Sequence, residues 1–297
     1  DFRDNTGEEA LWTNSMFGGM PAYLISTVYK SNLVKNINSI LQFAKRPASQ
    51  LFLLLIGAYF TLLMFGVSPW LSFLGAIAIS FTSYNFIIIS AGHNSKVIAI
   101  AYMAPTIGSI FYTMRKNAIL GGALTALFLG LLINAGHLQV TYYTFMIVLI
   151  LGIVELIYAI KTKQREFIKR ISILVVAAVL AIGSNFGSLW TTYEYGKYST
   201  RGKSELTHDQ ENKTSGLDKD YAMDWSYGVD ETLTLLIPNF KGGASVGSVG
   251  ENSSTYEFFK NIQGERYAAQ VTKQLPMYWG TQPGTAGPVY LGAVIVF

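Results

Sequence analysis

Residues 115–163 read RKNAILGGALTALFLGLLINAGHLQVTYYTFMIVLILGIVELIYAIKTK. Two apolar runs, 118–136 and 140–160, are joined by a short Gly-His turn, and basic residues stand at both outer ends. A helix that crosses a bilayer needs about 20 predominantly apolar residues. The stretch therefore predicts two membrane-spanning helices whose basic ends lie on the same side of the membrane. Glu155 lies near Lys161 at the end of the second run, so a structural role is expected for it.

Similar apolar runs continue on both sides of this stretch. The chain of 297 residues is 51% hydrophobic and 13% charged, about half the charged share of an ordinary soluble domain. It has no cysteine, which excludes disulfides and thiolate metal sites. The sequence predicts an all-α polytopic membrane protein. Six spans are expected, at 51–67, 70–90, 97–114, 118–136, 140–160 and 171–190.

A seventh span is expected to begin near Val289 and to be cut within the membrane, so we expect the chain to be a segment of a longer protein. Residues 1–50 are expected to form an extracytoplasmic loop, with an interfacial helix within 31–46. Residues 191–288 are expected to form a second, larger loop. A soluble protein with a buried all-helical core is the alternative, which six consecutive apolar runs disfavour.

The short connections indicate an orientation. Arg115 and Lys116 occupy one connection, and five basic residues occupy 161–170 against the single Glu166. An excess of Lys and Arg marks the cytoplasmic side. The net charge of +4 is explained by this placement, so no nucleic-acid partner is expected. On the outer face we expect four segments: 1–50, 91–96, 137–139 and 191–288.

Two Gly-His turns fall on that outer face. His93 and Lys96 follow Gly92, and His137 follows Gly136, each at the expected start of a helix. Cationic side chains at a helix N-terminus favour an anion, because free N–H groups and the helix dipole add to their charge. The alternatives are a Lys96 side chain that snorkels to the interface and structural histidines.

The two large outer segments carry carboxylates and aromatic rings. Asp1, Asp4, Glu8 and Glu9 form an acidic cluster, in which one carboxylate could act as a general base unless the cluster is simply a solvated loop. Aromatic rings interleaved with carboxylates suit sugar recognition in the later loop. A divalent cation is a further candidate ligand there, although no calcium-loop spacing is met.

Several phrases together resemble a known family: GEEALWTNSMFGGMPAY at 7–23, AGHNSK at 91–96, GHLQVTYY at 136–143, TRGKSEL at 200–206 and GLDKDY at 216–221. They resemble the YfhO-like family of bacterial polytopic membrane proteins, in the form found in Bacteroidota. That family is similar to the GT-C superfamily of membrane glycosyltransferases. The resemblance extends over essentially the whole chain.

The resemblance implies a multi-pass protein of the bacterial inner membrane with large extracytoplasmic loops. It implies an inverting transfer of a sugar from a polyprenyl-phosphate carrier to a glycan or protein acceptor. Asp4 and Asp1 are the candidate bases, although the family's catalytic Asp follows a first span that would precede Asp1. The candidate phosphate ligands are His93, Lys96, His137 and Arg201, with Arg201 favoured for its guanidinium fork.

The sugar and acceptor cleft is expected to be lined by Trp12, Tyr193, Glu194, Asp220, Tyr221 and Trp225. Two other functions stay open. A lipid or glycolipid transporter would need polar or broken helices near the bilayer midplane. A structural or assembly subunit would instead dock a partner protein of the cell envelope through the outer loop.

Overall fold

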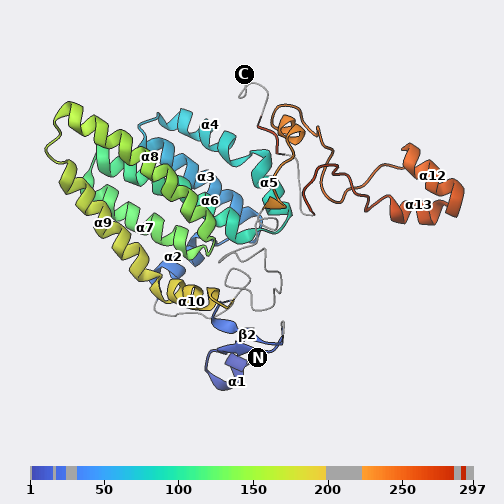
Figure 1. Cartoon of the computed structure of the whole chain (residues 1–297), viewed down its shortest axis with the longest axis horizontal. Helices are drawn as coiled ribbons and strands as arrows, with labels where there is room; N and C mark the ends of the chain where they lie inside the picture. Colours follow the sequence, from blue (N-terminus) through green and yellow to red (C-terminus); the bar gives the residue numbers. More distant parts are fainter. Residues whose placement is uncertain (1, 16–17, 25–31, 199–222, 284–288, 292–297) are drawn as a thin grey trace, which may run out of the picture. The chain divides into compact units, whose positions relative to one another are not determined.

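The computed structural model describes all residues except 1, 16–17, 25–31, 199–222, 284–288 and 292–297, and it is mostly helical (Figure 1). The chain divides into two compact units. Unit 1 comprises 1–81 and 92–202, and unit 2 comprises 82–91 and 203–297.

Unit 1 is a helical bundle built around one central helix. This helix, α6 (Asn94–Arg115), packs against four others, which are α3 (Ala48–Met64), α7 (Ala118–Asn134), α8 (Leu138–Thr162) and α9 (Phe167–Ser184). In addition, α4 (Pro69–Ser80) packs on α3. The smaller elements are α1 (Phe2–Thr6), β1 (Trp12–Thr13), β2 (Met20–Pro21), η1 (Ala22–Leu24), α2 (Leu33–Leu41) and α10 (Phe186–Gly196).

Three helices, α6, α8 and α9, are long and apolar enough to cross a membrane. Together α4 and α5 (Ser83–Ser90) pass the same criteria as a pair, whereas α3 and α7 are shorter apolar helices of 17 residues each. In the most apolar part of α6, 61% of the residues are buried, against 17% in α8 and 11% in α9. Soluble proteins rarely expose such apolar faces. The burial therefore favours a membrane protein over a soluble helical core.

Two expected spans are interrupted. The expected helix 70–90 is divided at Phe81 and Thr82, where the Thr82 backbone is extended (ψ 148°). The expected helix 171–190 ends at Ser184, and α10 starts at Phe186. Between them the buried Asn185 donates from Nδ2 to the carbonyl oxygens of Ala181 and of Gly130 on α7, both at 3.0 Å. A polar side chain that binds the neighbouring backbone fixes this break, which the apolar pattern does not reveal.

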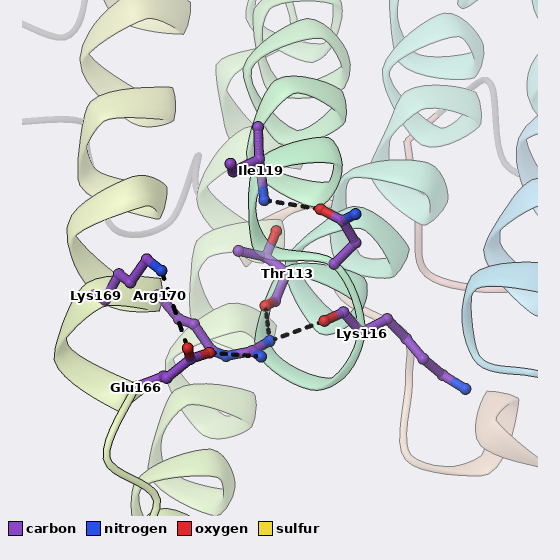
Figure 2. Close-up of polar contacts among 7 residues, drawn as sticks. Thr113, Lys116, Ile119, Glu166, Lys169 and Arg170 are labelled. Carbon is purple, nitrogen blue, oxygen red and sulfur yellow. Dashed lines mark hydrogen bonds and ion pairs between the residues drawn. The ribbon is translucent and has the colours of Figure 1, made fainter.

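The basic turns at one end of the bundle are held by side-chain contacts (Figure 2). Arg170, near the start of α9, donates from Nη1 to the carbonyl oxygens of Thr113 (2.7 Å) and Lys116 (3.2 Å) at the end of α6. Its Nη2 also lies 3.2 Å from a carboxylate oxygen of Glu166. These carbonyls have no donor within their own helix, so Arg170 acts as a side-chain cap for α6.

A second arginine at this end binds the charged residue inside α8. Arg115 Nε lies 2.8 Å from Oε2 and 2.9 Å from Oε1 of Glu155, whose side chain is only 3% exposed. The guanidinium also lies 3.4 Å from the centroid of the Tyr158 ring. The structural role expected for Glu155 is therefore that of a buried ion-pair partner, and its cation is Arg115 rather than Lys161.

The region expected to hold an interfacial helix contains α2. Asn32 caps it, because its Oδ1 accepts from Lys35 N at 3.1 Å. The helix contacts α7, and Asn38 Oδ1 accepts from the Tyr102 hydroxyl of α6 at 2.8 Å. Leu33 and Ile40 nevertheless stay 74% and 73% exposed. This exposed apolar edge suits a helix that lies on the headgroup layer.

Unit 2 contains α5, η2 (Asp230–Leu235), α12 (Ser254–Gln263) and α13 (Glu265–Val271). Two isolated β-bridges, Gly242 with Tyr278 and Gly247 with Leu275, join its loops. The hydroxyl of Ser83, at the start of α5, donates to the Tyr290 carbonyl at 2.7 Å. This last contact joins α5 to a segment 207 residues later in the chain.

Candidate functional site

The site is built on two turns of the same shape in unit 1. Gly92 and Gly136 have positive φ values of 78° and 72°, which only glycine adopts without strain. Each is followed by a histidine that stands at the N-cap of the next helix, His93 before α6 and His137 before α8. The local sequence Ala-Gly-His thus reverses the chain and puts an imidazole at a helix start in both places.

The two turns line one pocket of about 360 Å³, formed by residues 92–96, Gly136 and His137. His93, Lys96 and His137 all contribute to its wall. The N-termini of α6 and α8 meet there as well, and each carries the positive end of a helix dipole. The pocket therefore combines a lysine, two imidazoles and two helix starts, which suits a phosphate or another anion.

The electrostatics of His137 follow from its position. Burial lowers the pKa of this imidazole below its ordinary value of 6.5, and the positive charge of Lys96 lowers it further. The Nδ1 atom is buried and has no hydrogen-bond partner among the described residues. At neutral pH the imidazole is therefore neutral, and an anion bound beside it would favour its protonation.

One wall of the pocket is anchored by a contact that the sequence pattern does not reveal. Gln50, at the start of α3, is 1% exposed, and its Nε2 donates to Asn94 Oδ1 at 2.7 Å. Gln50 and Asn94 are 44 residues apart. The only signal in the sequence is a polar residue at the edge of an apolar run, and that signal does not identify a partner.

The other candidate residues fall elsewhere. Asp1, Arg201, Asp220 and Tyr221 lie outside the described residues, and Asp4 lies in α1 with its side chain outside the description. Trp12 is 56% exposed in the small hairpin, where its Nε1 donates to Asn14 Oδ1 at 3.0 Å. Trp12 does not line the pocket.

Two of the predicted cleft residues, Tyr193 and Glu194, lie on α10. Phe186, Trp190 and Tyr193 follow one another along α10 with ring centroids 5.8 and 6.2 Å apart. Glu194 pairs with Lys197 at 2.9 Å, and the Lys197 ammonium lies 4.9 Å from the Tyr193 ring centroid. Trp225, the remaining candidate, belongs to unit 2, where its carbonyl accepts from Gln282 Nε2 at 2.7 Å. The expected sugar cleft stays a prediction.

Unit 2 holds a buried carboxylate that the sequence pattern does not single out. Glu231 is fully buried, and the Tyr278 hydroxyl donates to its Oε1 at 2.5 Å. The Gly228 N–H donates to Oε2 at 3.3 Å. Burial, and then the bond to Glu231, raise the pKa of Tyr278 to about 12. The pair fixes η2 against the later loop.

Replacing Tyr278 with phenylalanine is expected to destabilise the protein by about 1–3 kcal/mol, because Glu231 Oε1 loses its donor while it stays buried. The pKa of Tyr278 is raised on folding, so the stability from this bond is complete below pH 10 and is lost as pH rises toward 12. Chemical unfolding measured from pH 8 to 12 tests both effects. Tyr267→Phe, at a half-exposed ring, is the control; an equal loss in both variants would contradict a special role for Tyr278.

A metal ion has no evident site in the described parts of the chain, where no three His, Asp or Glu side chains lie close enough together to hold one. Comparison of the chain with family models, with curated proteins and with solved structures gives no match. The family resemblance therefore stays a prediction, and the pocket of His93, Lys96 and His137 is the feature that bears most directly on function.

Proposed function

We propose that the protein is a membrane glycosyltransferase of the GT-C type that binds the phosphate of a polyprenyl-phosphate-linked sugar in the pocket of His93, Lys96 and His137. The observation that supports this proposal is the convergence of these three side chains and two helix N-termini in one pocket. The pocket lies at the end of the bundle opposite to the Arg115 and Arg170 contacts, since α6 starts at the pocket and ends at those arginines.

The proposed topology follows from the positions of the pocket and the arginine contacts at opposite ends of the bundle. The basic end would face the cytoplasm of a bacterium, and the pocket would face the outer side of its inner membrane, in a multi-pass arrangement of six spans. The donor would reach the pocket from the outer leaflet, with its prenyl chain in the bilayer. The acceptor hydroxyl would approach from the aqueous side.

In the proposed reaction, a carboxylate such as Asp4 or Asp1 takes the proton of the acceptor hydroxyl. The acceptor oxygen then bonds to the anomeric carbon of the sugar, and the bond between that carbon and the phosphate oxygen breaks with inversion. The electron pair leaves with the polyprenyl phosphate. Lys96 and the two histidines would stabilise the charge that develops on this leaving group.

Replacing Lys96 with alanine is expected to weaken donor binding about 10- to 100-fold, which corresponds to the loss of one charge-assisted hydrogen bond. Binding of a labelled polyprenyl-phosphate sugar to the purified chain in detergent measures the loss. Lys45→Ala removes an exposed lysine outside the pocket and serves as the matched control. Equal affinities for the two variants would exclude the pocket as the phosphate site.

The pH dependence gives a second readout. The pKa of His137 lies below 6.5 in the free protein, and bound phosphate would raise it. The affinity for the donor should therefore increase as the pH falls from neutral to below 6.5. His137→Gln should remove that increase.

A transfer assay with labelled sugar and an acceptor distinguishes a transferase from a transporter. If the protein binds the donor and moves it across a bilayer but transfers no sugar, the result would favour a transporter.

A further inference from the structure

A groove runs between α7 and α9 in unit 1, apart from the proposed phosphate pocket. It has a volume of about 640 Å³. Its apolar wall includes Ile119, Gly122 and Ala126 from α7 and Ala177 and Leu180 from α9. Small side chains on both helices leave this space open, and the exposed α9 surface beside it is apolar. Such a groove accepts a hydrocarbon chain and would exclude a polar ligand.

One end of the groove is polar. Among the described residues that line it, Lys169 alone carries a charge. Lys169 Nζ lies 4.0 Å from Glu166, and both side chains are more than half exposed, so the pair leaves the ammonium open to another anion. Figure 2 shows Lys169 on α9 and Ile119 on α7 at this end, beside Arg170.

The helix directions strengthen the positive potential there. Arg170 near the start of α9 binds the Lys116 carbonyl just before the start of α7, so both helices begin at this end. Their parallel dipoles therefore place two positive ends beside Lys169. The groove thus combines an apolar channel with a cationic mouth.

The length of the groove matches one leaflet. From Lys169 to Leu180 the helix rises about 16 Å, at about 1.5 Å per residue. The hydrocarbon core of a bilayer is about 30 Å thick, so each leaflet contributes about 15 Å. An acyl chain laid against α7 and α9 would therefore reach from the headgroup layer to the bilayer midplane.

We propose that the α7–α9 groove is a binding site for an anionic phospholipid from the leaflet at the basic end of the bundle. One acyl chain lies along Gly122, Ala126 and Ala177, and the phosphate contacts Lys169. Anionic headgroups are selected by the charge at the mouth, whereas the apolar channel itself selects only for a chain. This site is separate from the pocket of His93, Lys96 and His137, which lies just beyond the C-terminal end of α7.

Native mass spectrometry of the purified chain tests the proposal. The protein in detergent is titrated with dioleoyl-phosphatidylglycerol and, separately, with dioleoyl-phosphatidylethanolamine, which has the same acyl chains and no net charge. Phosphatidylglycerol should be retained preferentially. Lys169→Gln should reduce that preference about fivefold, as expected for one basic residue near a membrane surface. Lys161→Gln, at an exposed lysine outside the groove, should leave it unchanged.

A second pair of variants tests the apolar channel. Ala123→Phe fills the groove from an exposed position and should abolish retention of the bound phosphatidylglycerol, whereas Val154→Phe on the exposed face of α8 should not. Equal retention of the two lipids, or equal effects of the two lysine variants, would overturn the proposal. A dimer mass that Ala123→Phe removes would also overturn it, because the groove would then hold a second copy of the chain.

Discussion

Replacing Arg115 with methionine is expected to lower the free energy of unfolding by about 3–5 kcal/mol, because it leaves the Glu155 carboxylate buried without its cation. Glu155 is 2% exposed and lies within α8, one of the helices long enough to cross a membrane. The same change also removes the guanidinium from the Tyr158 ring. Thermal unfolding in detergent, followed by circular dichroism, measures the loss.

Two further variants identify the cause. Arg165→Met removes an exposed arginine from the same end of the bundle and should change stability by less than about 0.5 kcal/mol. The double variant Arg115→Met with Glu155→Met replaces the ion pair by apolar side chains and should recover most of the loss. If Arg115→Met and Arg165→Met had the same effect, the ion pair would not contribute to stability.

Replacing Gly57 with leucine is expected to destabilise the bundle by about 3 kcal/mol, at the upper end of the cost of overpacking. A Cβ atom at Gly57 would meet the Ala101 carbonyl oxygen on α6, and a backbone atom cannot rotate away. Pro105 has no N–H, so this carbonyl lacks its usual helical donor, and the Gly57 backbone packs against it. Chemical unfolding of the purified chain measures the change.

Gly152→Leu is the matched control. Gly152 lies on α8, where a Cβ atom would meet no other atom within 4 Å, and leucine is a better helix former than glycine. This variant should be neutral or stabilising by up to about 1 kcal/mol. Equal losses at both positions would show that glycine matters for helix flexibility in general and not for the contact between α3 and α6.

The sequence predicts most of the helical pattern of unit 1 because hydropathy is a local property. The runs at 118–136 and 140–160 correspond closely to α7 and α8, and the basic residues before the first run and after the second stand where α7 begins and α8 ends. The breaks at 81–82 and at Asn185 escape such reasoning. At Asn185 the decisive contact reaches the Gly130 carbonyl, 55 residues earlier in the chain, and hydropathy does not encode a contact between such distant positions.

In the candidate site, too, sequence reveals the features that depend on neighbouring residues and misses those that depend on contacts between distant residues. The Ala-Gly-His turns are local signals, and their repetition is enough to single out His93 and His137. The bond from Gln50 to Asn94 and the Glu231–Tyr278 pair join residues 44 and 47 positions apart. Neither has a spacing that a motif would reveal, because the fold alone creates the proximity.

The cap that Arg170 provides for α6 has a consequence for biosynthesis. The Lys116 carbonyl and its donor Arg170 are 54 residues apart, so the hairpin of α6 and α7 leaves the ribosome before α9 does. Until α9 has been synthesised and inserted, water at the bilayer surface has to solvate the exposed end of that hairpin. This contact therefore forms only when α9 packs against the turn between α6 and α7.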